Sequence, residues 1–495
     1  MLSEKSFRYF VFHHHLACLL TAVGVGITLF AVFKFFYPHP NMVMDSYVYI
    51  RAMAFNLGAN SFPIGYSKFL QLFSLVSRNT TLLVWIQFLF LQAACLWFFF
   101  TFLFFFRPSK WVTRILFVFL FFNPILLYIC NFIMADPLFT TLSLLWFTLL
   151  IWIIARPRPY MIFVHALLLA VVFTVRYNAL YYPFAAGLIL LLARLRPWLK
   201  VQAIALPFIL IGAFVLYTSS QMQQLMGVRN FSPFGGWKLA NNALYMYGHV
   251  CQERTDTVPQ KFAQVDHMVR HYFHRTKVVD DLMDYESYST GSFYAAVDSS
   301  PLVEYMFARY GGDAQFQNFR KWGPMGSFYG EYGAYLLKEY PLSFARYFMW
   351  PNMARYILPP REIFSHPTPY LMRTDDLGQL AGNWFGLKTL AVPPSYIDFR
   401  TALLSPFPAL LALIHIAFIL GFTGFGLFGG FKKVTKTNAS IIIAMGGLWI
   451  LDFCFNVTAS PVVLRYQLFL MILEFAFTLQ FLAFISADTS KSTTP

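Results

Sequence analysis

The sequence predicts an all-α polytopic membrane protein with about ten transmembrane helices and one mixed, largely helical domain outside the membrane. Hydrophobic residues make up 58% of the 495 residues and charged residues only 12%, whereas soluble domains average about 25% charged residues. Long apolar runs recur along the chain, and one long polar segment, 219–400, interrupts them. The chain therefore divides into an N-terminal transmembrane module (1–218), an extracytoplasmic domain (219–400) and C-terminal transmembrane helices (401–495).

The transmembrane helices are expected where the sequence approaches or reaches about 17–25 consecutive apolar residues. The division is open between Cys130 and Leu199, where the runs follow one another closely. The expected spans are Leu16–Tyr37, Leu82–Phe106, Val112–Cys130, Pro137–Ala155, Tyr160–Val175, Ala179–Ala193, Leu199–Thr218, Ala402–Phe428, Ala439–Phe455 and Leu464–Ile485.

The net charge of +15 does not indicate a nucleic-acid partner, because the excess of cations lies in short loops between apolar runs. Cytoplasmic loops of membrane proteins carry an excess of Lys and Arg. If every cation cluster is cytoplasmic, both termini are cytoplasmic and segment 219–400 is extracytoplasmic. The clusters are Lys5/Arg8, Arg107/Lys110/Arg114, Arg156/Arg158, Arg194/Arg196/Lys200, Lys432/Lys433/Lys436 and Lys491.

The first outer loop, 38–80, carries Asp45, the only acidic residue between Glu4 and Asp136. The composition predicts a helix from Asp45 to Leu57 that ends at Gly58, with Asp45 as its N-cap. A second short helix, expected after Pro63, is too short to span and is expected to lie at the membrane surface. Asp45 is either only a cap or also a general base, and the two roles are compatible.

Other charged residues are expected on the same outer face. Asp136 precedes Pro137, a helix-start signal that is as consistent with capping as with a functional role. Four cations are individually ordinary for a membrane surface, but together they could bind a phosphate. These cations are Arg51, Lys68, Arg176 and Arg465.

Two acids, Asp452 and Glu474, fall inside predicted spans, where ionisable residues are costly. Pairing of Asp452 with Arg465 is the favoured interpretation, ahead of a catalytic role. Asp266 shares one predicted helical face with three histidines, which suggests either a metal cluster or, as we favour, a solvated face. The histidines are His267, His271 and His274. No disulfide framework, metal motif or nucleotide-binding motif is present.

Several short motifs resemble the GT-C superfamily of membrane glycosyltransferases, especially bacterial relatives of the protein O-mannosyltransferases and of the lipid A aminoarabinose transferase. In the first outer loop they are Asp45 followed by YVYIRAM and FPIGYSKFL. MADPLFTTLSLL opens the fourth span, RYN follows the fifth, and LRYQLFL opens the last. The resemblance covers roughly Leu16–Thr218 and the last span.

The resemblance implies a bacterial inner-membrane enzyme, and we expect no cofactor and no metal site, although metal dependence itself stays open. It would transfer a sugar from a polyprenyl-phosphate donor to a lipid, glycan or protein acceptor. Asp45 would be the general base and Asp136 a second active-site acid. Phosphate binding would fall to Lys68, Arg176 and Arg465, with Tyr49, Arg51 and Tyr466 in support. Many family members follow the loop aspartate with a second acid, whereas this chain has Ser46.

Two alternatives stay open. A transporter or flippase of lipid-linked sugars would use the same cationic outer rim without transfer chemistry. A glycan polymerase or ligase would share the architecture and use a different donor. The absence of internal repeats and the bulky one-sided domain favour the transferase over the transporter.

Overall fold

The computed structural model describes residues 6–193, 195–252, 258–276, 293–296, 299–311, 319–360, 376–386 and 404–492. Within these ranges the fold is helical and contains no β-strand. Asn41 and Phe132 form an isolated β-bridge. The all-α prediction is therefore confirmed for the described part of the chain.

The N-terminal module is built from apolar helices joined by short links. Two of its helices, α3 and α4, form the loop that follows α2. The elements are α1 (Phe7–Tyr9), η1 (Phe10–His14), α2 (Leu16–Phe36), α3 (Met44–Ala54), α4 (Gly65–Ser74), α5 (Thr80–Phe106), α6 (Lys110–Phe121), α7 (Pro124–Cys130), α8 (Ala135–Ala155), α9 (Pro159–Val175), η2 (Tyr177–Tyr181), α10 (Tyr182–Leu192) and α11 (Pro197–Met226).

The polar segment and the C-terminal part are also helical where described. The polar segment contains α12 (Pro233–Val250), η3 (Gln260–Phe262), α13 (Ala263–Arg275), α15 (Phe293–Ala296), α16 (Pro301–Tyr310), α17 (Phe319–Glu339), α18 (Pro341–Phe344), η4 (Ala345–Met349), α19 (Trp350–Ile357) and α20 (Asp376–Phe385). The C-terminal part contains α22 (Phe407–Leu427), α23 (Gly430–Lys433), α24 (Lys436–Ala459), η6 (Leu464–Gln467) and α25 (Leu468–Ser492).

Eight apolar segments in the described part of the chain are long enough to cross a membrane. The other two expected spans correspond to shorter apolar helical segments, Pro159–Val175 and Tyr177–Leu191. The seventh expected span is longer than its apolar run, because α11 continues past Thr218 to Met226. Met222 and Met226 are buried there among the residues of the polar segment, which explains why the helix extends beyond the apolar run.

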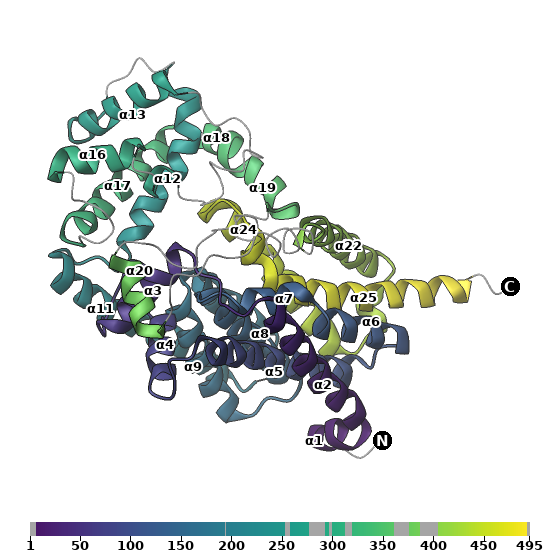
Figure 1. The fold of residues 1–495 in the computed structure, drawn as a ribbon. Helices are drawn as coiled ribbons and strands as arrows, with labels where there is room; N and C mark the ends of the chain where they lie inside the picture. The colour runs from purple at the N-terminus through teal and green to yellow at the C-terminus, as the bar shows by residue number, and fades with distance from the viewer. Residues whose placement is uncertain are drawn as a thin grey trace.

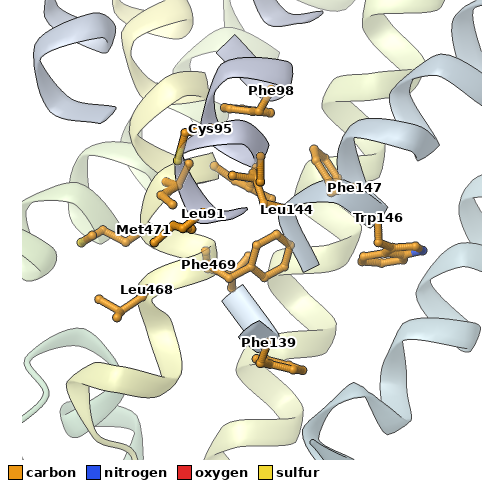
Figure 2. Packing of buried hydrophobic residues seen from close by; sticks show 14 of the residues in the cluster. Leu91, Cys95, Phe98, Phe139, Leu144, Trp146, Phe147, Leu468, Phe469 and Met471 are labelled. Carbon is orange, nitrogen blue, oxygen red and sulfur yellow. The ribbon is translucent and has the colours of Figure 1, made fainter. Parts of the chain in front are cut away.

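The apolar helices pack around α5, α8 and α25, whose aromatic and aliphatic side chains interdigitate (Figure 2). Leu91 and Cys95 of α5 lie beside Leu144 of α8 and Met471 of α25 in this core (Figure 2), and all four side chains are fully buried. This core gives the bundle the rigidity on which residues at its ends depend.

The helices α12–α19 form a unit at one end of the apolar bundle, which we call the helical domain (Figure 1). It has its own hydrophobic cluster. Its centre is the pair α12 and α17, in which a Cβ added to Gly236 would lie 1.7 Å from the carbonyl oxygen of Gly326. Only glycine permits this approach. The glycines of α12 and α17 therefore let these two helices pack closely against each other.

Asp266 does not share the exposed face of α13 with the three histidines, and this expectation is wrong. Its carboxylate is buried and accepts hydrogen bonds from the hydroxyls of Tyr247 and Tyr332, at 2.8 and 3.0 Å. The histidines at 267, 271 and 274 are exposed. Among the residues that the structure describes, no group of three potential ligands could hold a metal ion.

The expected pairing of Asp452 with Arg465 is also wrong. Asp452 accepts hydrogen bonds from the hydroxyls of Tyr181 and Tyr356, at 2.5 and 2.8 Å. Sequence spacing could not reveal these partners, because they come from η2 and α19, far away in the chain. Glu474 of α25 lies 2.6 Å from Nδ1 of His415 on α22, and both side chains are fully buried.

Candidate functional site

Four charged side chains meet at the end of the apolar bundle that faces the helical domain. Asp45 comes from α3, Asp136 from the start of α8, Arg176 from the end of α9 and Arg465 from η6 before α25. They derive from four separate segments of the sequence. We call Asp45, Asp136, Arg176 and Arg465 the charge cluster.

Asp45 is not the N-cap of its helix, contrary to the sequence prediction. Helix α3 begins at Met44 with Val43 as N-cap, so Asp45 is the second helical residue. The N–H of Val43 donates to Oγ of Ser46 at 3.0 Å, and Ser46 is fully buried. Ser46 therefore stabilises the start of the helix. This leaves the Asp45 carboxylate available for other contacts, near the positive end of the helix dipole.

Asp136 also lies inside its helix rather than capping it. Helix α8 begins at Ala135 with Met134 as N-cap, and no side chain caps it. Asp136 is only 3% exposed. Its carboxylate is held by Arg176, which was expected to end the fifth span and is indeed the C-cap of α9.

The ion pairs of the charge cluster centre on the two arginines. Arg176 Nη1 donates a hydrogen bond to Oδ1 of Asp136. Arg465 Nη1 lies 3.4 Å from Oδ2 of Asp45 and 3.6 Å from Oδ2 of Asp136. The side chain of Asp45 is 31% exposed, whereas those of Asp136 and Arg465 are 4% and 8% exposed. Asp45 is therefore the acid of the cluster that a ligand can reach.

Aromatic rings enclose the two arginines. The Tyr466 ring centroid lies 4.6 Å from Cζ of Arg176 and 5.1 Å from Cζ of Arg465. Burial is the largest single influence on the pKa of Arg176 and lowers it, but interactions with Asp136, Tyr466 and Tyr49 together outweigh burial, and the pKa is raised. Tyr49 is buried, and burial together with the charge of Asp45 raises its pKa, so its hydroxyl stays neutral.

Buried hydrogen bonds fix the backbone on both sides of the cluster. The Tyr66 hydroxyl donates to Oε1 of Gln87 at 2.7 Å. The amide of Gln87 donates to the carbonyl oxygens of Cys130 and Phe132, at 2.8 and 3.1 Å, just before α8. Sequence analysis did not select Gln87, although a glutamine inside a long apolar run is a signal that could have identified it.

A backbone bridge then ties the loop of Asp45 to the residues that precede Asp136. The N–H of Asn41 donates to the carbonyl oxygen of Asn131 at 2.8 Å, and the N–H of Ile133 donates to that of Asn41 at 3.1 Å. This bridge sets the two aspartates at a fixed separation. The side chain of Asn131 adds a hydrogen bond to the carbonyl oxygen of His39 at 3.0 Å.

Lys68 and Arg51 take no part in the ion pairs of the charge cluster. The ammonium of Lys68 donates to Oδ1 of Asn56 at 2.7 Å and to Oε1 of Gln71 at 3.2 Å. Lys68 and Arg51 are both partly buried, and burial lowers the pKa of each side chain. The structure thus brings together Asp45, Asp136, Arg176, Arg465, Tyr49 and Tyr466 of the residues expected at the site.

One helix of the polar segment also reaches this end of the bundle. Helix α20 packs against α3, which carries Asp45 (Figure 1). Its Ala381 is fully buried, and its Trp384 ring lies 4.6 Å from Cζ of Arg78. Nothing in the amino-acid pattern of 376–385 placed this helix beside the first loop.

Comparisons with known protein families, with curated proteins and with solved structures gave no match. The resemblance to membrane glycosyltransferases therefore rests on the motifs of the sequence. What the geometry adds is chemical. In such a cluster a partly exposed carboxylate can accept a proton from one reactant, and the guanidinium groups can bind the anionic group of another.

Proposed function

We propose that this protein is a membrane glycosyltransferase of the GT-C type. It transfers a sugar from a polyprenyl-phosphate donor to a lipid, glycan or protein acceptor at the extracytoplasmic face of a bacterial inner membrane. The observation that carries the proposal is the charge cluster, in which a reachable acid, Asp45, adjoins Arg465, and Asp136 joins Arg465 to Arg176, at one end of the apolar bundle.

The location supports a lipid-linked donor. Arg176 ends α9, an apolar helix of 17 residues, and Arg465 precedes α25. A polyprenyl phosphate carries its charge at the headgroup plane, where its chain enters the apolar layer. Cations at the ends of apolar helices lie at the depth where such a phosphate sits.

The transfer reaction would proceed by displacement at the anomeric carbon. Asp45 accepts the proton of the acceptor hydroxyl or amine as that atom bonds to the anomeric carbon. The bond between this carbon and the phosphate oxygen breaks, and its electron pair leaves with the polyprenyl phosphate. The phosphate gains a negative charge in this step, so the guanidinium groups stabilise the transition state more than the ground state.

The two carboxylates would then have different roles. Asp136 is buried and paired with Arg176, so it orients the arginines rather than exchanging a proton with a reactant. Asp45 has only the 3.4 Å contact to Arg465 within the charge cluster. A donor phosphate would compete with Asp45 for Arg465, and this competition would release the carboxylate to act as a base when donor is bound.

The test is transfer by the purified full chain in nanodiscs, supplied with radiolabelled polyprenyl-phosphate sugars and an extract of envelope acceptors. The expected result is label in an acceptor fraction and release of polyprenyl phosphate. The control is the protein with both Arg176→Gln and Asp136→Asn, which keeps the net charge of the cluster. Translocation of the donor across vesicles without transfer would instead indicate a flippase and refute the proposal.

A further inference from the structure

The carbonyl oxygens at the C-terminus of helix α24 need hydrogen-bond partners that the residues following the helix do not supply. The last four carbonyl oxygens of an α-helix lack intrahelical partners. Many helices solve this with a left-handed glycine at the C-terminus. Here α24 ends at Ala459, and the next residue, Ser460, is extended with φ −164°. Pro461 then follows, so these oxygens need partners from elsewhere in the fold.

Two asparagines of the helical domain supply these partners. The Asn352 side-chain amide on α19 donates to the carbonyl oxygens of Asn456, Val457 and Ser460, at 3.2, 3.0 and 2.7 Å. The Asn242 amide on α12 donates to the carbonyl oxygen of Ala459 at 2.9 Å. Asn352 and Asn242 are each only 2% exposed. The end of α24 is therefore capped by another part of the molecule.

Asn352 also holds the turn that leads to Arg465. Its Oδ1 accepts the N–H of Val462 at 2.9 Å, three residues before Arg465. One helical turn further along α19, the Tyr356 carbonyl oxygen accepts a hydrogen bond from the Gln467 amide at 2.7 Å. The Tyr356 ring also packs in a small cluster with Val457 and Val462. Residues 462–467 are thus held by α19 at both ends.

The helical domain also contacts the loop that carries Asp45. The Phe234 ring on α12 packs edge to face on Phe62 in the loop of Asp45, with 5.6 Å between centroids. The helical domain therefore touches the segment that carries Asp45 and the segment that carries Arg465. These segments lie 420 residues apart in the chain, and their charged groups are 3.4 Å apart.

We infer that the helical domain positions Arg465, and that Asn352 is the residue through which it does so. Asn352 does not touch the charge cluster itself; it fixes the backbone from which Arg465 projects. In this way the polar segment helps to position Arg465, one of the two arginines that would bind an anion at the site. The consequence for the donor rests on the proposed function, whereas the hold on residues 462–467 does not.

The contact of α19 with residues 462–467 is tested by hydrogen exchange of the full chain in nanodiscs. Asn352→Ala removes the acceptor of the Val462 N–H and the cap of α24. Exchange in residues 462–467 is expected to accelerate at least about tenfold, since one buried hydrogen bond contributes roughly 0.5–1.5 kcal/mol and several are lost. Asn230→Ala is the control, because Asn230 also uses both ends of its side-chain amide: it donates to Oγ of Ser327 at 3.1 Å and accepts the N–H of Ser232 at 3.0 Å, at the start of α12 rather than at the end of α24.

A second variant keeps this test valid if Asn352→Ala does not fold. Asn352→Asp retains an acceptor for Val462 but loses the donors to the α24 carbonyls, so an intermediate rate is expected. Unchanged exchange in residues 462–467 of the folded variants would overturn the inference, whatever the protein binds. Acceleration equal to that of Asn230→Ala would overturn it as well.

The link to Arg465 is tested by a double-variant cycle with farnesyl phosphate as the probe. Asn352→Ala should weaken probe binding by about three- to tenfold in the native background and have no effect in the Arg465→Gln background. Equal losses in both backgrounds would overturn the inference. If the native protein binds no probe, the proposed function fails, and the exchange experiment alone then decides the hold on residues 462–467.

Discussion

Two buried aspartates of this protein have opposite surroundings. Asp136 is 3% exposed and Asp452 is 5% exposed, so burial does not distinguish them. Asp136 is paired with Arg176 and lies 3.6 Å from Arg465. Asp452 instead accepts hydrogen bonds from two tyrosine hydroxyls, within a region where His415 and Glu474 form a second buried pair.

The two regions also differ in their access to the surface. The group next to Asp136 is Asp45, whose side chain is 31% exposed, so the charge cluster opens to the surface. The groups around Asp452 are buried tyrosines, and its partners connect α24 to η2 and α19. A cluster of charges with one reachable member suits chemistry, whereas a closed hydrogen-bond network joins helices.

The largest effect is expected from Asp45→Asn. The asparagine keeps the shape of the side chain but cannot accept a proton from the acceptor. Loss of a general base typically lowers the rate by about 10²–10⁴-fold. Sugar transfer by the purified protein measures this. Because the competing carboxylate is removed from Arg465, affinity for farnesyl phosphate should be unchanged or higher.

The control for this variant is Glu331→Gln, an acid of the helical domain that is 60% exposed and pairs with Lys261 at 2.8 Å. It should leave the transfer rate unchanged. If the Asp45→Asn protein transfers sugar at the native rate, Asp45 is not the general base. The functional difference between the two regions would then be refuted.

The second effect concerns the arginines. Arg176→Lys keeps the positive charge beside Asp136 but loses the planar fork that grips a phosphate. A hydrogen bond to a charged group is worth roughly 1.5–3 kcal/mol. Affinity for farnesyl phosphate should therefore fall by about ten- to a hundredfold, as measured by calorimetry. Arg309→Lys, at an exposed arginine of α16 stacked on Phe328, is the matched control. If Arg176→Lys and the native protein bind farnesyl phosphate with equal affinity, Arg176 does not bind the donor phosphate.

The sequence predicted the helices well because apolar runs of this length have few alternatives to a transmembrane helix. It was less accurate at helix starts. Asp45 was expected as an N-cap, and Asp136 as either a cap or a functional residue. Each is instead the second residue of its helix, and its carboxylate lies beside an arginine. The composition around a helix start fixes its position only to within a residue or two. One residue of shift turns a capping carboxylate toward a different neighbour.

Partners far apart in the chain could not be predicted at all. Arg465 was assigned to Asp452 because the two are close in sequence, on either side of one turn. The structure instead joins Arg465 to Asp45 and Asp452 to Tyr356. Each of these contacts depends on how the helical domain and the bundle pack together. No periodic pattern in a single sequence contains that information.

The third prediction concerns Asp452. Its substitution should lower stability and leave donor affinity unchanged, which is the reverse of the effect expected for the charge cluster. Asp452→Ala leaves the hydroxyls of Tyr181 and Tyr356 without their acceptor in a buried site, at a cost of roughly 1–3 kcal/mol for each group. Asp452→Asn keeps one acceptor oxygen and should lose about half as much. Thermal unfolding measures the loss. Affinity of the folded protein for farnesyl phosphate should stay the same in both variants.

A fall in donor affinity of the folded Asp452 variants would contradict the distinction between the two regions. A double-variant cycle with Tyr356 sharpens the test. Tyr356→Phe removes one donor from the same carboxylate, so Asp452→Ala should cost less stability in that background than in the native protein. Full additivity of the two changes would mean that the hydrogen bond contributes nothing to holding α19 against α24.

The smallest effect is expected at Lys68, a predicted phosphate ligand whose hydrogen-bond partners lie outside the charge cluster. Its ammonium donates to Asn56 and Gln71. At physiological salt, charges on an exposed surface are screened within about 8 Å, so Lys68 influences the donor only through direct contact. Lys68→Met keeps most of the apolar stem and should change farnesyl phosphate affinity by less than about twofold, a shift at the limit of what ion-pair loss at a surface produces. A tenfold loss would mean that Lys68 leaves Asn56 to meet the phosphate, and the anion site would then extend from the charge cluster along α4.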